Sequence, residues 1–191
     1  MVKRQRVSVE DDLTGGTGDI NPQFMNVFAI QTGVDAAQTV EYTLPKPVIG
    51  TSKTHATIIE VLKVFFQVST LSIRKQNNAS DLSIFLGTKD PGVSPYARDS
   101  SCFAYYQMDM REVWVAGAGE SIDAVAYKEE PHIFDCTDGS GHGVLIASDT
   151  IFCTVDSSNT NLMNSGSAKI LYRYKTVGLL EYVGISQGQS S

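Results

Sequence analysis

The stretch KILYRYKTVGLLEYVGI, residues 169–185, carries the clearest alternation of side-chain character in the chain. Basic residues alternate there with apolar and aromatic ones, so that one side receives Lys169, Arg173 and Lys175 and the other Ile170, Tyr172 and Tyr174. A period of two residues is that of a β-strand with one buried face. The stretch therefore predicts a strand, which we expect to continue through residues 179–185.

Residues 57–70 form a second, strongly apolar stretch, in which Leu62, Val64, Phe66 and Val68 alternate with Lys63, Phe65 and Gln67. The same stretch is compatible with a helix, because Ile58, Val61, Leu62 and Phe65 share a helical face. Its β-branched and aromatic content favours a strand.

Shorter runs of the same composition predict further strands at residues 24–30, 39–44, 82–86, 102–108, 113–115, 133–134, 144–147 and 151–155. Loops are expected at residues 75–80, 88–100 and 156–167. No helix is predicted. Long connections favour a Greek-key or jelly-roll topology over an up-and-down meander. The expected fold class is all-β, a single jelly-roll β-sandwich of about eight strands with an extended N-terminal arm.

A chain of 191 residues fits one domain. We expect an extended, glycine-rich arm at residues 1–20, the jelly-roll domain at residues 21–186 and a polar tail at residues 187–191. No apolar run reaches the roughly 18 residues of a membrane span, and no secretory signal is visible. Three widely spaced cysteines, Cys102, Cys136 and Cys153, do not indicate a disulfide framework.

Charge argues against the whole chain as a nucleic-acid binder, because the net charge is -6. Only 19% of residues are charged, below the roughly 25% of an average globular protein, which suits a subunit buried among its own copies. One local basic segment, Lys3, Arg4 and Arg6, is a candidate contact for a genome. A merely solvated terminus is the alternative.

The segment HIFDCTDGSGHG, residues 132–143, gathers the side chains that could carry chemistry: His132, Asp135, Cys136, Asp138 and His142. Their spacing matches no standard zinc module. Asp135 and Asp138 beside glycines are candidate calcium ligands at a subunit boundary, although the full EF-hand loop is missing. A polar turn between two strands is the plainer interpretation.

Catalysis is not expected. Cys136 or Ser140 with His142 would need an orienting third group that sequence proximity does not supply. The string GISQG, residues 184–188, matches G-x-S-x-G, but its triad partners would have to follow it in the chain. No catalytic residue and no cofactor is therefore predicted. A sugar-binding platform is a further hypothesis for the aromatics Tyr105, Tyr106, Trp114, Tyr172, Tyr174 and Tyr182, although core packing is the more usual role.

The order of these parts, with the segments EVLKVFFQVS (residues 60–69) and ILYRYKTVGLLEYVGI (residues 170–185), resembles the single jelly-roll capsid proteins of small icosahedral viruses. The resemblance implies a virion protein that self-assembles through its sandwich and arm into a shell around the genome, together with copies of itself and other capsid proteins. Many such proteins carry a long basic arm; this one has three basic residues. That departure leaves room for a double-stranded DNA or membrane-containing virus, or for a minor capsid protein.

Two other functions stay open on the residues alone. One is a β-sandwich binding module of the lectin or spike type, which would bind a glycan or receptor with the loops at residues 97–101 and 157–167. The other is an enzyme, which would need a pocket that joins His132, Cys136 and His142.

Overall fold

The computed structural model describes residues 22–45, 54–68, 79–92, 97–111, 132–160 and 162–190. Nine strands and one helix lie in this part of the chain, in the order β1 (Gln23–Ile30), β2 (Gln38–Thr43), β3 (His55–Val68), β4 (Ala79–Gly87), β5 (Cys102–Arg111), β6 (His132–Asp135), β7 (Val144–Ile146), β8 (Thr150–Ser158), β9 (Ser165–Gly178) and α2 (Leu179–Ser190). Each strand predicted within the described residues corresponds to an observed strand, although the one that begins at residue 169 was predicted to run too far. The one predicted at residues 113–115 lies outside them.

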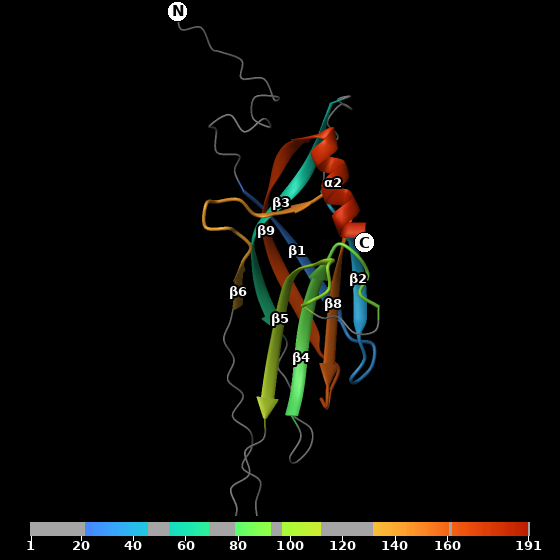
Figure 1. Cartoon of the computed structure of the whole chain (residues 1–191). Helices are drawn as coiled ribbons and strands as arrows, with labels where there is room; N and C mark the ends of the chain where they lie inside the picture. The colour runs from blue at the N-terminus through green and yellow to red at the C-terminus, as the bar shows by residue number, and fades with distance from the viewer. Residues whose placement is uncertain are drawn as a thin grey trace, which may run out of the picture.

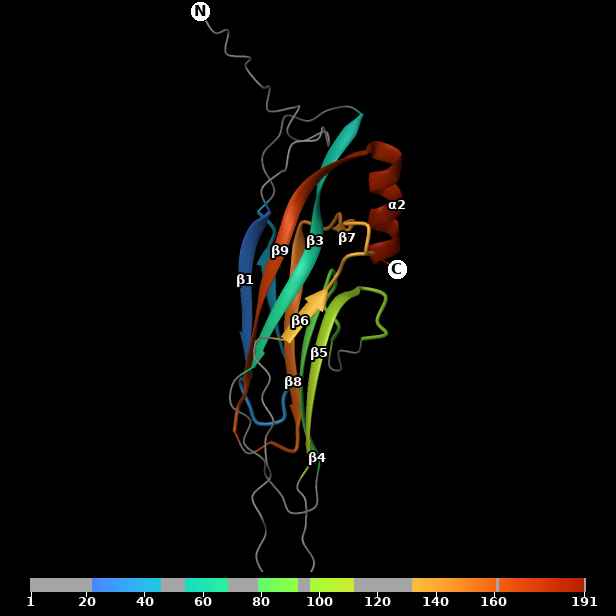
Figure 2. The same ribbon diagram turned by 90° about the vertical axis from the view of Figure 1, so that its left-hand side faces the viewer.

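The strands form two packed antiparallel sheets (Figure 1). The first sheet has the order β1-β9-β3-β6, with β7 also pairing with β3, and the second has the order β2-β8-β4-β5. Turned by 90°, the molecule shows β1, β9, β3 and β6 spread across the near side, with the second sheet beside them (Figure 2). Successive strands alternate between the sheets, with two exceptions: β4 and β5 are neighbours in the second sheet, and β6 and β7 both pair with β3 in the first.

The pairings are nested about β4 and β5. Those two strands pair with each other, β3 pairs with β6 and β7, β2 pairs with β8, and β1 pairs with β9. Two further pairings, β3 with β9 and β4 with β8, join the nested pairs into one five-stranded and one four-stranded sheet. This is a long antiparallel ribbon wrapped into a sandwich, which is the jelly-roll topology predicted from the long loops.

The core lies between the sheets. Alternate residues of each strand point into it, as the period of two requires. Fully buried members include Val64, Phe66, Leu82, Ile84, Ile151 and Ile170. In β3 the alternation is interrupted at Leu62, where the register against β9 shifts between Val61 and Lys63. The bulge explains why Val61 and Val64 both face inward although they are three residues apart.

The prediction of a strand at residues 179–185, and of no helix, is wrong, because the chain turns into α2 after Gly178. Gly178 pairs with His55, the first residue of β3, and the backbone N–H of Leu179 still donates to the carbonyl of Thr54 at 3.1 Å before the helix begins. Tyr182 and Ile185, three residues apart, lie on one face of the helix and pack against Ile58 and Val177. The helix also runs into the predicted polar tail at residues 187–191.

Candidate functional site

The predicted metal ligands lie at the end of β6 and in the loop that follows it, and each carboxylate there binds its own local partners. Asp135 accepts hydrogen bonds from the backbone N–H and hydroxyl of Thr137, at 2.9 and 2.7 Å, and lies 3.4 Å from the ammonium of Lys63. Asp138 accepts the backbone N–H groups of Ser140 and His142 and contacts the His142 ring at 3.2 Å. These hydrogen bonds hold the pKa of both carboxyls below the ordinary range.

Asp135 and Asp138 therefore shape the turn. Within the described ranges, no group of three or more His, Cys, Asp and Glu side chains is placed to hold a metal ion. His132 does not join the two carboxylates, because its ring stacks on Tyr106 with 4.6 Å between the ring centroids.

The candidate nucleophiles are not activated. Burial, followed by the neighbouring charge of Asp135, raises the pKa of the Cys136 thiol to about 11. The thiolate that would attack a substrate is therefore scarce at neutral pH. The G-x-S-x-G string at residues 184–188 lies within α2, whereas a nucleophile elbow sits between a strand and a helix.

The aromatic residues considered for a sugar platform are dispersed. Tyr106 stacks on Phe66 in the core, and Tyr172 is buried there too, with the Tyr174 ring against it. Tyr182 is part of α2 and packs against Ile58 and Val177. Tyr105 lies on the second sheet, where its hydroxyl donates to Gln107. Trp114 lies outside the described residues. No single surface joins the described members of this set.

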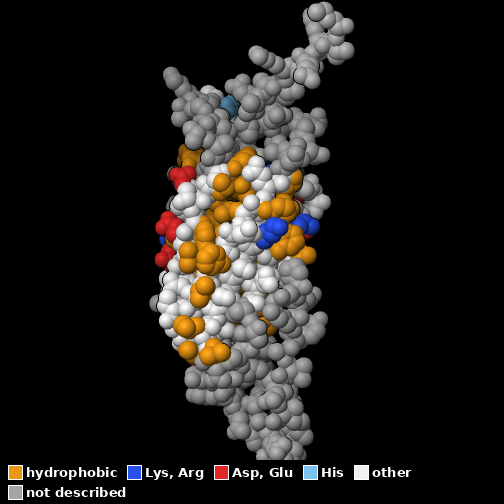
Figure 3. Space-filling model, turned by 180° about the vertical axis from the view of Figure 1, so that it is seen from behind, with side chains coloured by type: hydrophobic (Ala, Val, Ile, Leu, Met, Phe, Trp, Pro, Cys, Tyr) orange, Lys and Arg blue, Asp and Glu red, His pale blue; other side chains and the backbone are white. Residues whose placement is uncertain are grey.

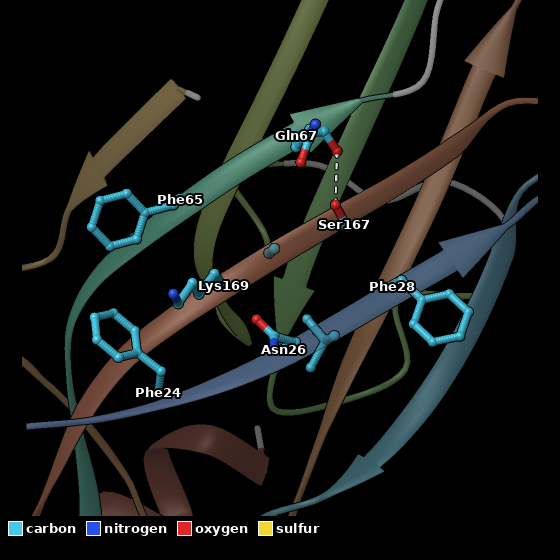
Figure 4. A pocket seen from close by; sticks show the side chains of 9 residues that line it. Phe24, Asn26, Phe28, Phe65, Gln67, Ser167 and Lys169 are labelled. Atoms are coloured by element: carbon cyan, nitrogen blue, oxygen red, sulfur yellow. Dashed lines mark hydrogen bonds between the residues drawn. The ribbon is translucent and has the colours of Figure 1, made fainter. Parts of the chain in front are cut away.

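A different group of residues forms an open surface on the first sheet. Outward side chains of three adjacent strands line a depression of about 460 Å³. We call this surface the aromatic face, and it consists of Phe24, Asn26, Phe28, Phe65, Gln67, Ser167 and Lys169 (Figure 4). Strand register explains the grouping, because Lys169 of β9 pairs with Asn26 of β1 and with Phe65 of β3. Phe24 and Phe28 are 52% and 56% exposed.

Lys169 is the cation of the aromatic face. Its ammonium lies 4.3 Å from the centroid of the Phe24 ring, which is a cation–π contact. Seen from behind, the molecule shows hydrophobic side chains over this side, with basic side chains among them (Figure 3). Exposed aromatic rings next to one another on a sheet face are typical of an interaction surface.

Towards α2, the outer face of the first sheet is covered. Near α2, the helix packs over Ile58 and Val177. In the middle, Glu60 is fully buried beneath the loop before β7, where Arg173 donates to it at 2.5 Å and Gly143 donates to it at 3.0 Å. Lys175 lies 3.8 Å from the same carboxylate. The aromatic face thus lies open beside a covered, internally paired region.

The edge strand beside the aromatic face is partly closed by a side chain. The hydroxyl of Tyr42 accepts the backbone N–H of Phe28 at 3.0 Å and donates to the carbonyl of Phe28 at 2.6 Å. Because these backbone groups point away from β9, they belong to the free edge of β1. Tyr42 therefore occupies one rung at which another strand would otherwise pair.

The sequence predicted the strand at residues 24–30 and missed the aromatic face. The alternation of Phe24, Asn26, Phe28 and Ile30 was a usable signal, since these four share one face of a strand. The predicted basic segment, Lys3, Arg4 and Arg6, lies outside the described residues. Among the described residues, no helix is both long and apolar enough to cross a membrane.

Comparison with known proteins gives a likeness of structure. No protein-family model and no curated protein matches the sequence. Among solved structures, the Merkel cell polyomavirus virus-like particle matches with a TM-score of 0.52 and 11% identity over 93% of this chain and 81% of that one. Merkel cell polyomavirus VP1 in complex with disialyllactose matches with a TM-score of 0.54 and 10% identity, covering 85% and 97%.

VP1 of the trichodysplasia spinulosa-associated polyomavirus, in complex with 3'-sialyllactose, matches with a TM-score of 0.51 and 11% identity over 85% of this chain and 97% of that one. Such identities establish a common fold and leave the function to be argued separately. The fold of this chain is that of a jelly-roll viral capsid protein.

Proposed function

We propose that this chain is a structural virion protein that self-associates through its sandwich into an icosahedral shell around a viral genome. The observation that carries the proposal is the aromatic face, on which the exposed side chains of Phe24 and Phe28 line a depression on a jelly-roll sandwich. The likeness to polyomavirus VP1, including a virus-like particle, supports the same function. No enzymatic role is proposed.

Assembly needs only weak contacts of this kind. A phenylalanine that is about half exposed leaves roughly 100 Å² to bury, which is worth about 2.5 kcal/mol at 25 cal/mol per Å². Phe24 and Phe28 both meet this description. Part of the gain is lost to the entropy of association, and a closed shell compensates by repeating the contact many times.

Light scattering and negative-stain microscopy of the purified chain test the proposal. We expect closed particles tens of nanometres across. A second protein that lacks residues 1–20 tests the role of the arm, whose loss should abolish or alter the particles. A full-length protein that stays monomeric or forms only a small ring, from low to high salt, would contradict the proposal.

A glycan-binding module is the second candidate, because two of the matched VP1 structures are complexes with sialylated oligosaccharides. Binding of sialyllactose to a chain that remains monomeric would favour this function over assembly. A glycan array on the same preparation provides the comparison.

Two residue sets from the sequence enter as parts of the proposal. Lys3, Arg4 and Arg6 would contact the genome, and Asp135 and Asp138 would bind calcium at a subunit boundary. Nuclease-resistant nucleic acid in particles, lost when the three basic residues are replaced, would support the first role. Dissociation of particles by a calcium chelator, reversed by added calcium, would support the second.

A further inference from the structure

The outer face of the second sheet carries a group of carboxylates. Asp81 of β4 lies directly opposite Asp109 of β5 in the strand register. Asp156 of β8 lies one rung further along, opposite Ser83. These three aspartates define the acidic face. None of the ion pairs within the described part of the chain involves any of them.

The acidic face costs the isolated chain stability. Like charges directly opposite each other on neighbouring strands repel. Burial, and after it the charges of Asp109 and Asp35, raise the pKa of Asp81; burial and the charges of Asp81 and Asp35 do the same for Asp156. Local rules of this kind are typically broken at functional sites, where another requirement outweighs the cost.

The aromatic face has the opposite charge. Lys169 is exposed and has no carboxylate partner among the described residues. The basic groups nearer α2 are already paired with a carboxylate, since Arg173 and Lys175 both lie against Glu60. The aromatic and acidic faces lie on the outer surfaces of different sheets, so one chain cannot bring them together.

We propose that the occupant of the aromatic face is a second copy of this chain, which presents its acidic face. This inference rests on the proposed function and specifies the contact. The exposed phenylalanines supply the apolar area, and the attraction between Lys169 and the aspartates sets orientation and partner choice. The contact is heterologous, because different surfaces of the two copies meet. Such contacts build a closed ring when the rotation from each copy to the next returns to the first copy.

Two charge reversals test the contact, one on each face. Lys169→Glu changes the aromatic face and Asp109→Lys the acidic face; Lys89→Glu, at an exposed loop position near Ser186 and Gln189 of α2, is the control for net charge. We expect each of the first two variants to associate at least about tenfold more weakly than the wild type. The control should assemble normally.

Stability distinguishes the proposed contact from damage to the fold. Asp109→Lys places an ammonium opposite Asp81, so the unassembled variant should melt higher than the wild type, by about 1–4 °C. A gain in Tm together with a loss of assembly is the expected signature. A loss of assembly accompanied by a fall in Tm would count against the proposal.

Mixing the two defective variants is the decisive measurement, because each retains one intact face. An equimolar mixture of Lys169→Glu and Asp109→Lys chains should form a dimer by sedimentation, while each variant alone stays monomeric. Larger species would also support the inference, because the two replacing side chains have opposite charges and can pair with each other. A monomeric mixture, or variants that assemble as the wild type does, would overturn the inference while particles of the wild type still uphold the proposed function. A wild type that never associates would overturn both.

Discussion

Replacing Arg173 by methionine should expose the cost of the buried carboxylate beneath the loop before β7. The Glu60 side chain is 0% exposed, and Arg173 donates to it at 2.5 Å. Removing one partner of a fully buried ion pair costs about 3–5 kcal/mol. Because the Arg173 side chain is 36% exposed, solvent already screens part of this interaction, and we expect about 2 kcal/mol. That corresponds to a fall in Tm of about 4–8 °C.

The pH dependence tests the cause. Burial opposes ionisation of Glu60, but the hydrogen bonds from Arg173 and Gly143 and the charges of Arg173 and Lys175 outweigh it and hold its pKa below the ordinary 4.5. In the wild type this group adds stability above pH 4.5 and loses it as the pH falls through the lowered pKa. In Arg173→Met the effect of burial dominates, and the pKa of Glu60 rises. The charged, buried carboxylate then destabilises the variant at neutral pH, and this cost disappears when acid protonates it.

The assay is urea denaturation of dilute, unassembled protein at pH 7 and near pH 4. The difference between wild type and Arg173→Met should be largest at pH 7 and shrink towards pH 4. Lys175→Met is the matched control, because Lys175 is equally exposed but lies 3.8 Å from Glu60, and it should cost less than about 1 kcal/mol. An equal loss for Arg173→Met at both pH values would refute the reasoning.

Three further predictions concern other parts of the fold. Gln31→Leu should lower the free energy of unfolding by about 2–4 kcal/mol in urea titrations, because Gln31 is 2% exposed and the backbone N–H of Asn164 would lose its acceptor. Thr32→Ala, at the exposed neighbouring residue, is the control and should change the free energy of unfolding little. Gly184→Ala should raise stability by about 0.5–1 kcal/mol, since a Cβ meets nothing within 4 Å and alanine favours a helix; an unchanged Tm would contradict this. Cys136, whose pKa is about 11, should react with iodoacetamide at pH 8 much more slowly than in the urea-unfolded chain, and equal rates would show that it is accessible and ionised.

Strand positions followed well from the sequence, because one face of each strand is buried and the period of two is explicit. The helix α2, by contrast, was not predicted from the sequence. Its first residues continue the apolar composition of β9, and only Tyr182 and Ile185 mark a helical face. The bulge at Leu62 is equally invisible without the register of β9.

The candidate surfaces depend on pairing, which the sequence does not state. Asp81 and Asp109 are 28 positions apart, and they become neighbours only through the β4–β5 register. Phe24 and Phe65 come together because β9 inserts between their strands. The proximity of Asp135 to Asp138 along the chain suggested a site, yet each carboxylate bonds to its own turn. Closeness in sequence was therefore a weaker guide than closeness across a sheet.

The central place of β9 in the first sheet has a consequence for biosynthesis. β9 pairs with both β1 and β3, so until the ribosome has released residues 165–178 the β1 edge that β9 covers stays open, and β3 is paired only on the side of β6 and β7. Until then, a nascent chain exposes two apolar strands with unpaired edges, which are sites of aggregation. The β4–β5 pair, by contrast, can form early because its contacts are local. Release of the last strand is thus the step that commits the polypeptide to its native topology, and a stalled chain is the species that a holding chaperone would need to protect.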